Sequence, residues 1–294
     1  MQAINENHSL KSGKAALIKE SASYFSESGQ EWFNEAQQAL VASDQIIEDL
    51  GLYSAMAKRK LGEERLQQAT IVDTRFSPVD ISRWTSAETA RLILLMTSIE
   101  NNPAQAESII SAYYRMGDES GHMALIRGLI FFAPADFLSV IALDVGRTNN
   151  LKVLAALTLD NPYPACFFSE EQFNQMVLKA LFLGLAIERI AGLNQRANPD
   201  LARMGENYVV EREQARRSVP VDIWLAISPC ASETGRQQMI KYLNHEEIGH
   251  RYYCSLGLIQ RLPKDPALLP ILRQQLDTEQ ETLILELLQD ALKT

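Results

Sequence analysis

The stretch that decides the fold is Asp160–Arg203, DNPYPACFFSEEQFNQMVLKALFLGLAIERIAGLNQRANPDLAR. Apolar residues recur in it every three or four positions, which is the spacing of a helix with one buried face. Ser169 with Gln172 is a capping-box pattern and Asn198 precedes Pro199, so helices are expected to begin directly after Ser169 and Asn198. Glycine and asparagine between 192 and 198 predict the turn that precedes the second helix.

The first of these helices, expected over Glu170–Leu183, carries three lines of side chains. Its predicted core face consists of Phe173, Met176, Val177, Ala180 and Leu181. Glu171, Gln175 and Lys179 follow one another at four-residue spacing and form a polar stripe, which is typical of a solvated face with an ion-pair relation. Asn174 lies at the boundary between these lines and is expected to be half-buried.

Similar helix-start patterns recur along the chain and predict about a dozen helices joined by loops of roughly two to six residues. They are Thr85 with Glu88, Asn102-Pro103, Gly117-Asp118, Asn244 with Glu247, Asp265-Pro266, and Asp277 with Gln280. Residues 67–83 lack a helical period, and their β-branched residues, together with a proline, predict an irregular, extended connector.

The expected architecture is an all-α fold. Short loops make consecutive helices antiparallel neighbours. Glu233–Leu243 with His245–Leu262, and Asp265–Gln275 with Asp277–Leu292, have the lengths of HEAT-like helix pairs. We therefore predict an α-solenoid of stacked antiparallel helix pairs without a significant sheet, with the apolar helices of 124–159 and 176–191 at its buried centre. The whole chain is expected to form a single elongated domain, with a possible subdivision into 1–66, 67–83, 84–217 and 218–294.

Composition narrows the class of protein. The 294 residues are 46% hydrophobic, enough for a sizeable core, and the formal net charge of −9 argues against a general affinity for nucleic acid. Cys166, Cys230 and Cys254 are odd in number and scattered, which predicts reduced packing residues. The N-terminus has no apolar signal region, and the most apolar run, 124–145, is interrupted by charges and a proline. We expect a cytoplasmic protein without a transmembrane segment.

Three runs of the deciding stretch resemble the signature segment of the EboA-domain family. They are Asn161–Pro164 (NPYP), Asn174–Phe182 (NQMVLKALF) and Gly192–Pro199 (GLNQRANP). The resemblance implies an all-helical protein encoded beside a TatD-like hydrolase, a UbiA-like prenyltransferase and sugar-phosphate-cyclase-like enzymes, in clusters linked to secondary-metabolite production or export. It implies an accessory role in a pathway and no particular reaction.

Polar residues of the same stretch form the candidate ligand- or partner-binding set. They are Tyr163, Asn174, Gln175, Lys179, Arg189, Arg196 and Arg203. If those after 170 converge around the turn at 192–199, near free helix-start amides, they could bind an acidic peptide, a carboxylate or a phosphate. The alternative is that the stripe is only solvated, that the asparagines only cap helices, and that Tyr163 only fills a packing gap.

Metal binding is the sharpest alternative, through two Glu-x-x-His motifs, Glu119/His122 and Glu247/His250. Di-iron bundles use two such motifs with two further carboxylates, here Glu88, Glu188 or Glu206. Each motif, however, follows directly on a helix-start signal, where capping alone explains the glutamate. His245 and His250 resemble a zinc motif but are five positions apart, and a helical rotation of roughly 140° would keep their rings from converging.

Two classes of function follow. The first is a non-enzymatic accessory or adaptor protein, without a cofactor, that binds a pathway enzyme or its product. The second is an enzyme of the same pathway, either metal-dependent through the Glu-x-x-His motifs or cofactor-free through Asn174, Lys179 and Arg189.

Overall fold

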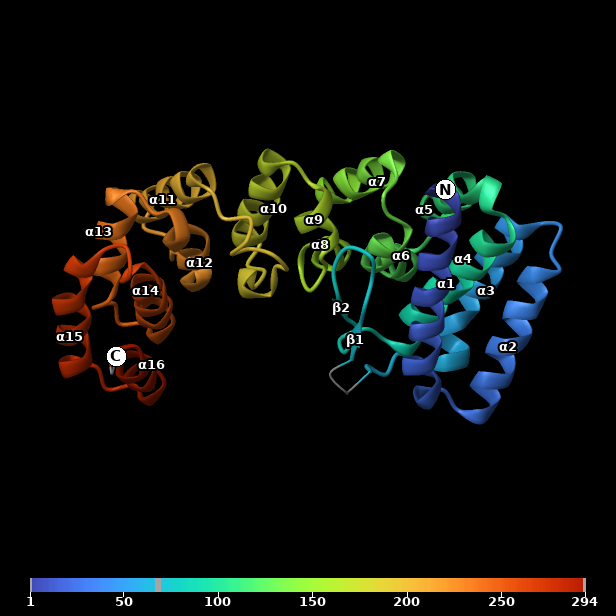
Figure 1. Ribbon diagram of the computed structural model, residues 1–294, viewed down its shortest axis with the longest axis horizontal. Helices are drawn as coiled ribbons and strands as arrows, with labels where there is room; N and C mark the ends of the chain where they lie inside the picture. The colour runs from blue at the N-terminus through green and yellow to red at the C-terminus, as the bar shows by residue number, and fades with distance from the viewer. Residues whose placement is uncertain (1, 67–69, 293–294) are drawn as a thin grey trace. The chain divides into compact units, whose positions relative to one another are not determined.

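The computed structural model describes residues 2–66 and 70–292, with side chains from Leu10 onward. In this part of the chain it has sixteen α-helices and one pair of two-residue strands, which confirms the all-α prediction (Figure 1). The chain divides into two compact units, unit 1 over Met1–Phe167 and unit 2 over Phe168–Thr294. This division lies inside the 160–203 stretch, whereas the subdivision considered from the sequence has its boundaries at 66, 83 and 217.

Unit 1 contains nine of the described helices and the strand pair. The elements are α1 (Gln2–Ser21), α2 (Glu27–Val41), α3 (Ile46–Leu61), β1 (Ile71–Val72), β2 (Val79–Asp80), α4 (Ser86–Asn101), α5 (Ala106–Met116), α6 (Glu119–Phe132), α7 (Asp136–Gly146), α8 (Leu151–Thr158) and α9 (Tyr163–Phe167).

Helix α4 is the centre of unit 1. Every residue from Ser86 to Ile99 is buried, because α1, α2, α3, α5 and α6 all contact this helix (Figure 1). Even its charged side chains are enclosed: Arg91 donates to the Ser54 carbonyl over 3.0 Å, and Glu88 completes the predicted capping box with Thr85. The expectation that 124–159 and 176–191 form the centre was therefore incomplete. Those segments also expose large apolar side chains, with Val140 67% and Phe182 68% accessible.

The predicted irregular, extended connector contains a small hairpin of two two-residue strands, which agrees with the prediction of an all-α fold without a significant sheet. β1 and β2 pair antiparallel, with Ile71 opposite Asp80 and Val72 opposite Val79. The Thr74 hydroxyl accepts the amides of Phe76 and Ser77 and closes the turn between the strands. The β-branched residues that removed the helical period are those that form the strands, and Val72 and Val79 are buried. Positions 67–69 of the connector lie outside the described residues.

Unit 2 is a succession of short helices. They are α10 (Glu170–Phe182), α11 (Pro199–Gln214), α12 (Trp224–Ile227), α13 (Glu233–Tyr242), α14 (Ile248–Arg261), α15 (Leu269–Thr278) and α16 (Thr282–Leu292). Both predicted helix pairs are present as α13 with α14 and α15 with α16, and α14 also packs on α16. A regular solenoid of such pairs stays a prediction.

The capping patterns of the sequence predicted helix starts correctly where the side chain of the capping residue accepts an amide of the first turn. Ser169 accepts the Gln172 amide and Asn198 the Leu201 amide, as predicted for α10 and α11. The starts predicted from Asn244 and Asp277 were wrong. Asp277 lies within α15, and Glu279 takes the amides that lead into α16, so α16 begins at Thr282.

Two further sequence expectations concern packing and membranes. Cys254 is buried and Cys230 partly so, but Cys166 is exposed, so its assignment as a packing residue was wrong. Within residues 2–66 and 70–292, no helix has an apolar stretch long enough to cross a membrane.

Candidate functional site

Tyr163 belongs to the core of unit 1. Its side chain is buried, its ring centroid lies 4.9 Å from that of Phe167, and its hydroxyl is 3.3 Å from the Ser139 hydroxyl. Asn161 holds the turn, because its side-chain oxygen accepts the Tyr163 amide while its nitrogen donates to the carbonyls of Ile126 and Ala156. The NPYP run thus acts here as a packing plug.

Asn198 joins Asn174 to the backbone of Arg196 in unit 2, because the Asn198 side-chain amide also donates to the Arg196 carbonyl over 3.0 Å. The amides of Asn174 and Asn198 bond reciprocally over 3.0 and 2.9 Å, and both side chains are buried, so Asn174 is more deeply placed than predicted. Arg196 donates to the Phe168 carbonyl over 2.8 Å, and its guanidinium lies 4.9 Å from the ring centroid of Phe173. These contacts fasten the start of α11 to α10 and account for the polar residues by folding.

The other predicted residues lie at the surface or in open hollows. Gln175 bonds Glu171 and Arg203 bonds Asp200, all of them exposed. Arg189 ends the short 3-10 turn Ile187–Arg189. Lys179 lines a hollow of about 450 Å³ between α10 and α11. Of the predicted set, the hydrogen bonds described above bring together only Asn174 and Arg196, and they do so through Asn198.

The first Glu-x-x-His motif is engaged by protein groups in unit 1. The two carboxylate oxygens of Glu119 accept from Asn150 over 2.8 Å and Lys152 over 2.7 Å. The His122 Nε2 atom lies 2.7 Å from the carbonyl oxygen of Tyr114. Both side chains thus tie the first turn of α6 to neighbouring segments.

The prediction that the rings of His245 and His250 do not converge was wrong. Their centroids are 4.4 Å apart, and with Glu247 they form, in the described part of the chain, a group of three possible metal ligands within 4.8 Å. The rotation argument failed because α14 begins only at Ile248, which leaves His245 in the preceding turn.

The hydrogen bonds of this cluster do not suit a metal ion. The indole N–H of Trp224 donates to Nδ1 of buried His250 over 2.9 Å, so the proton of the neutral ring sits on Nε2. A metal on Nε2 would require the proton to move to Nδ1, which would place two N–H groups face to face. Burial, followed by the neighbouring His245, lowers the pKa of His250 to about 4, which keeps this ring neutral.

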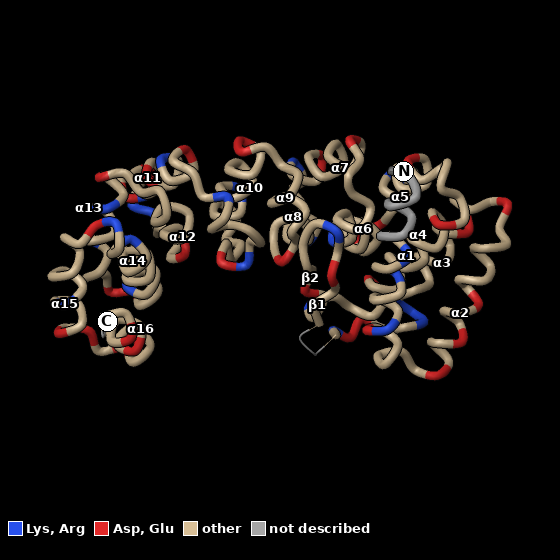
Figure 2. Tube along the Cα trace, viewed as in Figure 1, with Lys and Arg blue, Asp and Glu red and all other residues tan. Residues whose placement is uncertain are grey.

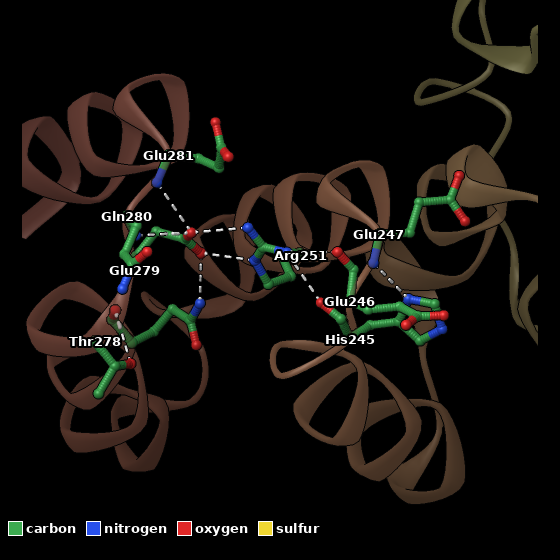
Figure 3. Close-up of polar contacts among 9 residues, drawn as sticks. His245, Glu246, Glu247, Arg251, Thr278, Glu279, Gln280 and Glu281 are labelled. Carbon is green, nitrogen blue, oxygen red and sulfur yellow. Dashed lines mark hydrogen bonds and ion pairs between the residues drawn. The ribbon is translucent and has the colours of Figure 1, made fainter.

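Arg251 and Glu279 lock the same end of α14 to the α15–α16 turn. Figure 3 shows the guanidinium between the Glu279 carboxylate and the turn that carries His245 and Glu246. Two of its nitrogens donate to Glu279 over 3.0 Å, and a third donates to the carbonyls of His245 and Glu246. We assign this network to stability rather than to ligand binding.

A hollow of mixed polar and apolar character lies elsewhere in unit 2. It measures about 410 Å³ and combines the turn after Ile187–Arg189 with one face of α14. Its lining is Glu188, Ile190, Gly192, Leu193, Asn194, Gln195, Leu225, Pro229, Tyr252, Tyr253, Leu256 and Gln260. Gly192 has φ of +76°, which favours glycine and sets the bend that presents Asn194 and Gln195.

A second hollow of about 340 Å³ adjoins the first. Glu188 and Tyr253 line both, and the Tyr253 hydroxyl donates to the Glu188 carboxylate. Burial and then this hydrogen bond raise the pKa of Tyr253, so the phenol stays a donor. We name the two hollows the turn hollow (the first) and the Asp222 hollow (the second, which Asp222 also lines).

Comparison with known proteins places the chain in a family. The family model described as metabolite traffic protein EboA matches residues 16–228. The chain belongs to the EboA family. A search of curated proteins and a search of solved structures each found no match.

The turn hollow combines EboA-matched and unmatched residues. Glu188–Gln195 and Leu225 lie within the matched range, whereas Tyr252, Tyr253 and Gln260 come from α14, beyond its end. Sequence reasoning missed the α14 residues because no spacing links them to a turn about sixty positions earlier. The signal available was the GLNQ run itself, whose glycine and amides do not belong to a helix face.

Proposed function

We propose that the protein is a non-enzymatic accessory protein that binds a small metabolite of its pathway in the turn hollow. The observation that carries this proposal is the composition of the hollow. At about 410 Å³ it has the size of small-molecule sites, and it combines apolar walls from Leu193, Leu225 and Leu256 with side-chain amides from Asn194 and Gln195. The family description as a metabolite traffic protein supports the same role.

The hollow lacks the features of a catalytic centre. Within the described residues, its lining has no histidine, cysteine or lysine, and its carboxylate belongs to Glu188, which the Tyr253 hydroxyl already engages. A site of this kind selects and holds a molecule, which is what a carrier or a delivery protein requires.

The test uses the metabolites of the producing cells. The purified protein is equilibrated with a small-molecule extract of those cells, separated from unbound material, and its bound fraction is identified by mass spectrometry. Leu256→Trp fills the hollow, and Leu283→Trp, at an exposed leucine of α16 (59% accessible), is the matched control. We expect one or a few compounds retained by the wild type and by the control, and lost with Leu256→Trp. Equal retention by all three proteins would refute the proposal.

A protein partner is the second candidate, and one surface favours it. Phe182 is 68% accessible at the end of α10, beside the open hollow lined by Leu178, Met204 and Tyr208. An exposed aromatic side chain next to an apolar groove is typical of an interaction anchor. Affinity purification of the wild type beside Phe182→Ser tests it: a pathway enzyme retained by both proteins would refute a role for this surface.

A further inference from the structure

We infer that the turn hollow and the Asp222 hollow form one site for an elongated, uncharged molecule that carries hydrogen-bond donors, and that this molecule displaces the Tyr253–Glu188 contact. This inference rests on the proposed function and specifies the class of its ligand.

The first step is the continuity of the two hollows. Glu188 and Tyr253 line both, and these two side chains are hydrogen-bonded to each other. The pair therefore stands between the hollows. Glu188 is the exposed residue of the 3-10 turn Ile187–Arg189, and Tyr253 is only half-buried, so both side chains can swing aside without disturbing the core. Once they part, the hollows join into a groove longer than either.

The second step is charge. Among the residues that the structure describes, neither lining contains a lysine, an arginine or a histidine, whereas Glu188 and Asp222 contribute carboxylates. Helix α12 (Trp224–Ile227), which contributes Leu225 to the turn hollow, contains no lysine or arginine (Figure 2). A carboxylate or phosphate ligand would find repulsion here and no compensating cation. The acidic ligand favoured by Arg196 and Arg203 in the sequence does not suit this site.

The third step is hydrogen bonding. Ionised carboxylates only accept hydrogen bonds, and the side-chain amides of Asn194, Gln195 and Gln260 both accept and donate. The lining of the two hollows therefore offers more hydrogen-bond acceptors than donors. Hydroxyl or N–H groups on the ligand supply the missing donors. Asp222 already accepts the Ile187 amide over 2.7 Å, and a hydroxyl or N–H group of the ligand takes the place of the Tyr253 hydroxyl on Glu188, so each carboxylate keeps an uncharged donor as its partner.

The fourth step is the shape of the ligand. Apolar side chains line both hollows, with Leu193 and Leu256 in the first and Leu181 and Leu185 in the second. Polar groups lie at the outer rim of the turn hollow, on Asn194 and Gln195. A ligand with an apolar body inside the hollows and a hydroxylated head group at that rim fits this arrangement of apolar and polar residues.

Alkyl β-glucosides are the probes for the first experiment, because they have a hydroxylated head and an uncharged chain. Binding of octyl glucoside, octyl sulfate and octylammonium is measured by calorimetry below micelle-forming concentrations. We expect octyl glucoside to bind at least roughly ten-fold more tightly than octyl sulfate, from repulsion by the two carboxylates. Equal or tighter binding of octyl sulfate or of octylammonium would overturn the assignment to an uncharged ligand.

Chain length tests the continuity of the hollows. Hexyl, octyl and decyl glucosides are compared on the wild type, Tyr253→Phe and the control Tyr53→Phe, which removes the hydroxyl of a half-buried tyrosine of α3 that lines neither hollow. Because Tyr253→Phe removes the contact that must break, we expect it to bind the decyl probe roughly ten-fold more tightly than the wild type does, with the hexyl probe unchanged. The same gain for every length, or none, would overturn the continuous site.

Blocked variants separate this inference from the proposed function. Leu256→Trp and, at the exposed rim, Gln195→Trp both obstruct the turn hollow, and each is checked by its melting temperature. If they bind every probe as the wild type does, the hollow is not a binding site and both proposals fail. If they abolish binding but the comparison of charged and uncharged probes contradicts our expectation, only the assignment to an uncharged ligand fails. If they abolish binding but the chain-length comparison contradicts it, only the continuity of the two hollows fails.

Discussion

Replacement of Glu279 by glutamine should weaken unit 2, because this carboxylate is the acceptor on which the α14–α16 network converges. Burial alone would raise the pKa of Glu279, but the hydrogen bonds from Arg251, from the backbone amides of Glu281 and Gln280, and from Gln275 outweigh it and lower the pKa to about 2. The Glu279 side chain is only 2% accessible. The ionised form is therefore bound far more tightly in the folded chain than in the unfolded one.

The magnitude follows from the two pKa values. The difference between the ordinary 4.5 and about 2 corresponds to about 3 kcal/mol at roughly 1.4 kcal/mol per pKa unit. Arg251 remains partly in contact with water, so we discount this to about 2 kcal/mol. Because the folded pKa is the lower one, the stabilisation is complete above pH 4.5 and disappears as the pH falls through 2.

Hydrogen exchange followed by mass spectrometry measures the free energy of local opening for peptides from α14 to α16, and so reports the loss of stability in this part of unit 2. Glu279→Gln should lower them by about 2 kcal/mol at pH 7, and the difference from the wild type should shrink below pH 4.5. Glu286→Gln, at an exposed position of α16, is the matched control and should change them by less than about 0.5 kcal/mol. If the two variants behave alike, or the difference persists unchanged at pH 3, the reasoning is wrong.

Three further predictions follow from the packing. Asn174→Ala should cost about 2 kcal/mol in thermal unfolding, because the buried Asn198 amide loses the two reciprocal hydrogen bonds that it makes with Asn174; an unchanged melting temperature would contradict this. The His250 ring should titrate near pH 4 in an NMR titration, and stability should fall as the pH drops from 6.5 towards 4, since the folded chain favours the neutral ring; a midpoint near 6.5 would refute it. Gly235→Ala should destabilise, because its Cβ would lie 2.4 Å from a carboxylate oxygen, whereas Gly51→Ala, with open space around it in a helix, should stabilise by about 0.5–1 kcal/mol; urea unfolding distinguishes the two.

The parts of the fold that could be predicted from the sequence are those decided by contacts between residues close together in the chain. Thr85, Ser169 and Asn198 cap helices because the partners of their side chains lie within three residues, and no distant group is needed. The start of α16 was misplaced because Glu279 is held by Arg251, a residue 28 positions away. A cap decided by such a contact has no sequence signature.

The candidate site was less predictable for the same reason. Asn174 and Arg196 were identified as candidate binding residues, and their partners, Asn198 and the Phe168 carbonyl, give each of them a place in the fold that the sequence did not reveal. Their role in binding stays a prediction. The contact between Glu188 and Tyr253 spans 65 positions. Neither residue belongs to a motif, so only the tertiary structure brings them to one place.

The burial of α4 has a consequence for how this protein tolerates genetic change. A helix enclosed from Ser86 to Ile99 has no outer face on which substitutions are neutral. In a saturation library, we expect these fourteen consecutive positions to form an unbroken band of intolerance, without the three-to-four-residue rhythm that a half-exposed helix leaves. We therefore expect natural substitutions in unit 1 to concentrate on the outward-facing positions of the helices around α4, and α4 itself to change little.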